Sequence, residues 1–152
     1  MVAERGPEKI KTIGDAYMVA GGLPEPLDGH ADKVIDLGLA MLLVAERFTV
    51  DLPDVALRVG IHSGPAAGGV IGTRRFVYDV WGDTVNVASR LEESGIPGKV
   101  HVSEATRMMA TNGFAFEPCE AVTLQGVGLV NTYFVSPHPT AVTNKTGLPV
   151  SE

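Results

Sequence analysis

Two side chains near the start of the chain, Lys11 and Asp15, could take part in chemistry because they flank a predicted hairpin turn. The dipeptide Gly14-Asp15 separates two short apolar segments, which predicts strands over 9–12 and 16–20. A carboxylate held at a rigid turn suits Mg²⁺, which prefers oxygen ligands. The alternative is a surface lysine beside an ordinary turn aspartate, and these two residues alone do not decide between the two interpretations.

The stretch FVYDVWGDTVNVASRLEE, residues 76–93, holds a second group of polar side chains. Asp79 lies in a predicted strand, and Asn86 and Arg90 lie four residues apart in the helix predicted to follow it. Residues at this spacing share one face of a helix. An asparagine can bind a sugar hydroxyl, and the planar fork of an arginine can bind a phosphate. The alternative is that Asn86 and Arg90 simply face solvent.

Other features of the sequence exclude some kinds of site. The glycine-rich segment 64–72 follows one predicted strand and begins another, and it opens no helix, which disfavours a phosphate-binding loop. The four histidines are scattered and none is spaced as a metal ligand pair, so a zinc site has no support. Cys119 is the only cysteine, which excludes an internal disulfide and fits a reducing compartment such as the cytoplasm.

The composition predicts one globular domain. The chain has 152 residues, 45% of them hydrophobic and 20% charged, so it can bury a core. Twelve basic and eighteen acidic residues give a net charge of −6, which argues against a nucleic-acid partner. No apolar run approaches the roughly 20 residues of a membrane helix, and residues 1–8 lack the apolar core of a signal peptide.

The polar side chains are expected on alternating short elements. Helices are predicted over 30–48, 83–94 and 103–110, and further strands over 55–62, 65–72, 76–80, 100–102, 114–118, 121–124 and 132–135. The first helix shows an apolar stripe at spacings of three and four: Val34, Leu37, Met41, Val44 and Phe48. Residues 1–135 are expected to form the domain, and 136–152, rich in Pro, Thr and Gly, a flexible tail.

Three segments together, KIKTIGDAYMVAGG, LRVGIHSGPAAGGVIG and RRFVYDVWGDTVNVASRLEESG, resemble the catalytic domain of class III nucleotidyl cyclases, of the bacterial adenylate cyclase type. The resemblance runs from about Glu8 to Val135, with the three motifs in the family's order. It implies an α+β, ferredoxin-like sandwich with a central, mostly antiparallel sheet and helices. It also implies a dimer, formed with a second copy or with another cyclase domain, whose active sites lie at the interface.

The resemblance assigns a role to each candidate residue. Asp15 matches the second of two metal-binding aspartates, Lys11 and Asp79 match the pair that recognises adenine, Asn86 the residue that orients the ribose, and Arg90 the one that stabilises the phosphorus centre. The implied reaction converts ATP to cyclic AMP and pyrophosphate with two Mg²⁺ or Mn²⁺ ions. In the family the metal aspartates belong to one protomer, and the adenine pair, Asn and Arg to its partner.

The sequence departs from the family pattern in two places. No aspartate precedes Asp15, and residues 1–5 match the end of the family's second helix, so we expect a partial domain that lacks the first strand and the first helix. The turn LQGVG at 124–128 contains no lysine where the family has one for the triphosphate.

The expected function is therefore that of an adenylate cyclase domain in intracellular signalling, with weak or no activity in this form. Two alternatives stay open. One is a non-catalytic, cyclase-like module that binds nucleotide or pairs with another cyclase domain. The other is a guanylate cyclase, against which Lys11 and Asp79 argue. Because domains of this family are often fused to membrane or sensor domains, the resemblance leaves a membrane-anchored parent protein open.

Overall fold

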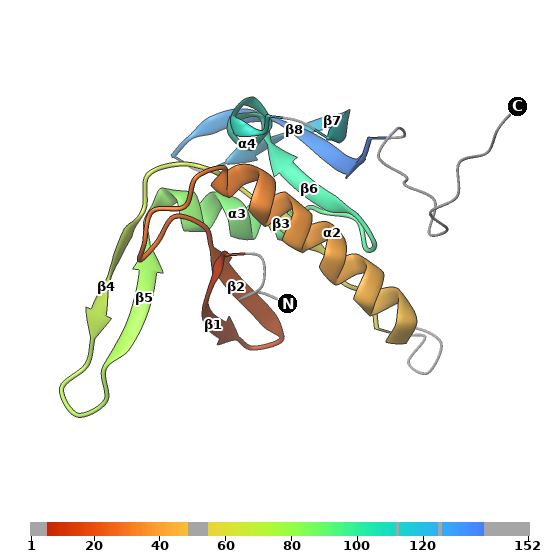
Figure 1. Cartoon of the computed structure of the whole chain (residues 1–152). Coiled ribbons are helices and arrows are strands. Elements are labelled where there is room, and N and C mark those ends of the chain that lie inside the picture. The colour runs from red at the N-terminus through yellow and green to blue at the C-terminus, as the bar shows by residue number, and fades with distance from the viewer. Residues whose placement is uncertain (1–5, 49–54, 112, 125, 139–152) are drawn as a thin grey trace, which may run out of the picture.

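The computed structural model describes residues 6–48, 55–111, 113–124 and 126–138. The helix end expected at residues 1–5, Gln125 of the lysine-free turn and residues 139–152 of the expected tail lie outside these ranges. The described part is an α+β fold in which three helices and two small two-stranded sheets are arranged around one central sheet (Figure 1).

The central sheet has four strands in the order β3–β6–β8–β7. Strands β3 (Val59–Ile61) and β6 (Val100–Ser103) run parallel. Strand β8 (Gly128–Pro137) pairs antiparallel with β6 on one side and with β7 (Phe114–Leu124) on the other. The sheet is therefore mostly antiparallel, as the sequence predicted.

Helices cover both faces of the β3–β6 pair. The methyl groups of Val59 and Ile61 face α2 (His30–Phe48), whereas Gly60 between them faces α3 (Asp83–Glu93). Successive residues of a strand point to opposite faces, so α2 and α3 lie on opposite sides of the strand. The short helix α4 (Glu104–Met109) follows β6 directly. No helix within the described ranges is long and apolar enough to cross a membrane.

Helix α2 has the predicted length, but its buried face matches the predicted stripe only in part. Its most buried positions are Ala31, Ile35, Leu37, Gly38 and Leu42, while Phe48 of the predicted stripe is exposed. A Cβ on Gly38 would lie only 3.1 Å from Val59, so the missing side chain lets the helix approach the sheet. A periodicity that counts only large apolar residues overlooks such contacts by alanine and glycine.

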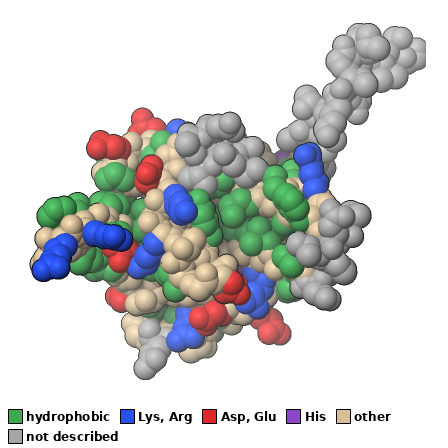
Figure 2. All heavy atoms as spheres, turned by 90° about the horizontal axis from the view of Figure 1, so that it is seen from below, with side chains coloured by type: hydrophobic (Ala, Val, Ile, Leu, Met, Phe, Trp, Pro, Cys, Tyr) green, Lys and Arg blue, Asp and Glu red, His purple; other side chains and the backbone are tan. Residues whose placement is uncertain are grey.

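Two hairpins project from this body (Figure 1). One consists of β1 (Glu8–Ile13) and β2 (Ala16–Ala20), and the other, which we call the arm, of β4 (Ala67–Ile71) and β5 (Val77–Trp81). The arm and the turn at its end leave large apolar side chains exposed: Val70, Ile71, Phe76, Val77 and Trp81. Basic side chains lie at its outer end, at the left of Figure 2.

The strand boundaries differ most from the sequence-based expectation in three places. Strand β3 has three residues instead of the eight expected over 55–62. Strand β7 is a single strand with an irregularity between Cys119 and Val122, where two strands were expected. Strand β8 continues to Pro137, two residues past the expected end of the domain. Alternation of apolar and polar residues predicts that a segment forms a strand. The length of that strand depends on the partner strand with which it pairs.

Truncation of Leu91 is expected to destabilise the domain strongly. Leu91 is fully buried on α3, in a cluster with Val87 and Leu124. Removing a buried leucine side chain costs about 2–5 kcal/mol because it leaves a cavity. We expect Leu91→Ala to lower the free energy of unfolding by that amount in urea denaturation. Leu129→Ala, at a strongly exposed leucine, is the control; equal losses in both variants would contradict the assignment.

Candidate active site

Lys11 and Asp79 are joined by an ion pair although 68 residues separate them. Lys11 on β1 places Nζ 2.8 Å from Oδ2 of Asp79 on β5, so the first hairpin and the arm meet at this contact. The other carboxylate oxygen, Oδ1, accepts a hydrogen bond of 2.8 Å from the backbone N–H of Val80. Both side chains are partly exposed, at 35% and 22%, so a ligand can reach them.

This pair offers one donor group and one acceptor group side by side. An ammonium has three N–H donors and a carboxylate about four lone-pair sites, so each keeps free capacity after the ion pair forms. The hydrogen bond from Lys11 is the largest cause that holds the pKa of Asp79 below its ordinary value of 3.8, followed by the bond from Val80. Asp79 is therefore a carboxylate at neutral pH.

The pKa of Asp79 is expected to rise when Lys11 is replaced by methionine, because the largest cause of the lowered pKa is removed. In the wild type the ion pair stabilises the fold at pH values above the ordinary pKa and is lost as the pH falls through the lowered one. A carboxyl NMR titration over roughly pH 2 to 6 measures this. Lys9→Met, on the same strand but beside Tyr17, is the control. An unchanged Asp79 titration in Lys11→Met would contradict the prediction.

Asn86 and Arg90 line an open groove of about 420 Å³ between α3 and the β7–β8 end. Both side chains are exposed, whereas the residue that follows each of them along the helix, Val87 or Leu91, is buried. The groove is lined by Asp83, Asn86, Val87, Ser89, Arg90, Glu93, Leu124 and Val127. A ligand in the groove can therefore reach Asn86 and Arg90, because the groove opens to solvent.

Helix α3 begins close to the Lys11–Asp79 pair. Gly82 is its N-cap, with a φ of 130° that favours glycine, and Asp79 lies three residues earlier. No side chain caps this end; the backbone N–H groups of Val85 and Asn86 donate to the carbonyl of Gly82. The short link fixes how far the strand that holds Asp79 lies from the helix that holds Asn86 and Arg90.

A buried polar network, which the sequence did not indicate, anchors the loop before the arm. His62 Nδ1 lies 2.7 Å from Ser103 Oγ, and Thr106 Oγ1 donates to Ser63 Oγ over 3.1 Å. Burial lowers the pKa of His62 below 6.5, so its imidazole is neutral at neutral pH. Thr84 Oγ1 of α3 donates to the carbonyl of Pro65 in the same loop. The loop is thus tied both to β6–α4 and to the first turn of α3.

Arg90 already has an acidic partner. Its Nη1 donates to Oε2 of Glu93 over 2.8 Å. The spacing of three residues on a predicted helix is the signal that could have identified this partner. With Asp83 and Glu93 against Arg90, the charged residues that line the groove sum to −1.

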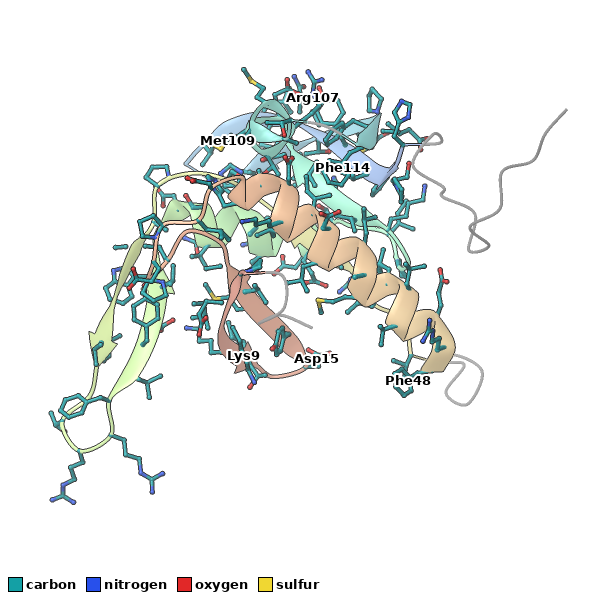
Figure 3. The ribbon with its side chains drawn as sticks, in the orientation of Figure 1. Lys9, Asp15, Phe48, Arg107, Met109 and Phe114 are labelled. Carbon is teal, nitrogen blue, oxygen red and sulfur yellow. The ribbon has the colours of Figure 1, made fainter. Side chains whose placement is uncertain are left out.

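Asp15 lies at the turn of the first hairpin, where Figure 3 shows it, and its side chain is exposed. Within the described ranges no three His, Cys, Asp or Glu side chains are grouped so that they could hold a metal ion. Asp15 therefore belongs to no group of three or more such ligands within the described ranges. Neither Asp15 nor Lys11 nor Asp79 lines the groove of Asn86 and Arg90, so the structure joins Lys11 to Asp79 but does not gather all five residues in one pocket.

The family model described as the adenylate and guanylate cyclase catalytic domain matches residues 1–137. The chain belongs to this family. The resemblance inferred from the three motifs is thereby confirmed, and the cyclase domain extends over nearly all described residues.

Relatives of this cyclase domain include enzymes named for both purine nucleotides. It is 42% identical over 130 residues to the rat (Rattus norvegicus) guanylate cyclase soluble subunit beta-2, covering 84% of this chain and 19% of that protein. It is 38% identical over 136 residues to an adenylate cyclase of Mycobacterium tuberculosis, covering 89% of this chain and 31% of that protein. The chain thus spans about a fifth to a third of these relatives, and overall identity does not decide the substrate.

A solved relative supports the fold. The guanylate cyclase domain of RhGC from Catenaria anguillulae, determined in complex with GTP, superposes with a TM-score of 0.82 at 33% identity. The match covers 90% of this chain and 75% of that one. The α+β arrangement described above is therefore the nucleotidyl cyclase fold.

Proposed function

We propose that this cyclase domain acts on ATP and forms 3′,5′-cyclic AMP and pyrophosphate, as part of intracellular signalling. The observation that supports this choice is the Lys11–Asp79 ion pair. Adenine presents an exocyclic N6–H₂ donor beside an N1 acceptor. A carboxylate accepts from the first and an ammonium donates to the second, so the two side chains match the adenine edge.

Guanine presents the reversed pattern at this edge, with an O6 acceptor beside an N1–H donor. O6 would then face the Asp79 carboxylate and N1–H the Lys11 ammonium, which leaves polar groups unpaired on both sides. Sites built to hydrogen-bond one pattern reject the other for this reason. Lys11 and Asp79 therefore favour ATP over GTP.

In the proposed reaction the ribose 3′-oxygen attacks the α-phosphorus of ATP. A bond forms between them, the bond between the α-phosphorus and the bridging oxygen breaks, and pyrophosphate leaves. Asn86 would hold the ribose and Arg90 would stabilise the charge that develops at phosphorus. Mg²⁺ or Mn²⁺ would activate the attacking oxygen and neutralise the triphosphate.

The metal would need ligands from outside the described part of one chain. Mg²⁺ is held by one or two carboxylates together with substrate phosphates, and Asp15 can supply one carboxylate. We infer that a second cyclase domain completes the site, by supplying the metal aspartates opposite Lys11, Asp79, Asn86 and Arg90 of this chain. The exposed apolar side chains of the arm offer surface that such a partner would cover.

A second candidate function is a cyclase-like module that binds nucleotide and pairs with another domain without turnover. The lone Asp15 and the net charge of −1 in the groove favour it. Both candidate functions use the Lys11–Asp79 pair to recognise adenine, so a preference for ATP over GTP does not distinguish the non-catalytic module from the enzyme.

The decisive experiment measures binding and turnover separately. The full chain is titrated with ATP and with GTP, and then assayed for cyclic AMP and cyclic GMP with Mn²⁺. The assay is run with the chain alone and with the chain mixed with an adenylate cyclase domain whose own transition-state arginine has been replaced. We expect tighter binding of ATP than of GTP, little turnover alone, and cyclic AMP in the mixture.

Each contrary result has a distinct meaning. Cyclic GMP in excess of cyclic AMP would overturn the choice of base. ATP binding with no turnover in any mixture would select the non-catalytic module. Binding of neither nucleotide would overturn both candidates.

A further inference from the structure

We propose that Glu93 is a built-in competitor for the phosphate at Arg90: it holds the guanidinium when no nucleotide is bound, and the phosphate has to displace it. This inference rests on the proposed function, because it takes Arg90 as a phosphate ligand. It adds a residue that tunes nucleotide affinity through another side chain, so Glu93 is a positioning residue.

The geometry shows that Glu93 already holds the guanidinium of Arg90. Arg90 Nη1 donates to Glu93 Oε2 over 2.8 Å, within α3 and within the lining of the groove. The pair is solvent-exposed, with 61% and 53% of the two side chains accessible. A carboxylate and a phosphate both bind the planar N–H fork of arginine, so Glu93 and a phosphate compete for the same guanidinium.

The charges around the groove increase the effect that we expect Glu93 to have on phosphate binding. Arg90 is the only cation among the described lining residues, and Asp83 and Glu93 are both acidic. A polyanion that approaches this groove therefore meets a net charge of −1, and the one favourable charge is already paired. Neutralising Glu93 would both free Arg90 and bring the net charge of the lining to zero.

The neighbouring Glu92 has a different ion-pair partner from Glu93. Glu92 pairs with Arg58 at 2.9 Å and does not line the groove. It belongs to the same helix and bears the same charge. Glu92→Gln thus changes the net charge of the chain by the same amount without releasing Arg90.

Because the Arg90–Glu93 pair is exposed, we expect its loss to change phosphate affinity only moderately. Exposed ion pairs are weak and screened by salt, so a phosphate that binds the guanidinium can displace the carboxylate. We expect Glu93→Gln to lower the dissociation constant for a phosphate ligand by about two- to fivefold at low ionic strength, the range that corresponds to an exposed pair. High salt should remove most of the difference.

The test is an NMR titration of the full chain with inorganic pyrophosphate in the absence of divalent cations, which follows the side-chain signals of Asn86 and, in the variants that keep it, Arg90. The variants are Glu93→Gln and Glu93→Ser, with Glu92→Gln as the charge-matched control. Each is repeated in an Arg90→Ala background. We expect both Glu93 variants to bind more tightly than the wild type, the control to bind as the wild type does, and the gain to vanish without Arg90.

The outcomes separate this inference from the proposed function. If Arg90→Ala abolishes binding but the Glu93 variants bind as the wild type does, the competition is refuted and the phosphate role of Arg90 stands. A gain that persists without Arg90, or that Glu92→Gln reproduces, also refutes the competition, since bulk charge would then explain it. If pyrophosphate fails to bind in every variant, the phosphate role fails together with the inference.

Discussion

Replacing Arg90 with alanine is expected to lower the rate of cyclic AMP formation far more than it weakens ATP binding. Arginines that stabilise a transferring phosphoryl group contribute on the order of 10³–10⁵ in rate in other enzymes. In the mixed dimer described above, where Arg90 is the only such arginine, we expect kcat to fall by about a thousandfold or more. The affinity for ATP should fall less, because the base and ribose contacts remain.

The control for this variant is Arg107→Ala. Arg107 also pairs with a glutamate three residues away on a helix, Glu104, at 2.9 Å, and does not line the groove. Truncating it should leave turnover unchanged. Because Arg90 is largely exposed, its loss should leave the free energy of unfolding nearly unchanged as well. A variant that loses ATP affinity but keeps kcat would show that Arg90 only binds substrate.

The double substitution Lys11→Glu with Asp79→Cys is expected to shift the preference of the domain from ATP towards GTP. The glutamate would accept from guanine N1–H, and the cysteine would remove the charge that repels O6. Each mismatched polar contact costs about 1–3 kcal/mol, so each position should change the ratio of the two kcat/KM values by roughly 5- to 150-fold. The assay compares cyclic AMP and cyclic GMP formation in the same mixed dimers.

Single variants and a neighbouring lysine provide the controls for this prediction. Lys11→Glu alone places two carboxylates where the 2.8 Å ion pair was, so it should weaken the contact between the first hairpin and the arm. Lys9→Glu makes the same charge change on the same strand without touching Asp79 and should leave the ratio unchanged. An ATP to GTP ratio that does not move in the double variant would refute the role of the pair in base choice.

The sequence by itself determined the local elements and the identity of the family. The turn dipeptide Gly14-Asp15 predicted the first hairpin, and the apolar spacing over 30–48 predicted α2 with its observed length. The helix predicted over 83–94 matches α3 to within one residue. These signals are local: turn chemistry and helical periodicity depend on neighbours within a few residues.

Only the tertiary structure decided which distant residues meet. It joined Lys11 to Asp79 and formed a groove from α3 and the β7–β8 end. It also limited β3 to the residues that β6 pairs with, and buried Gly38 rather than Phe48 against the sheet. The physical reason is that strand pairing, helix approach and ion pairing are set by contacts between segments far apart in the chain, whereas sequence patterns report the propensity of each segment alone.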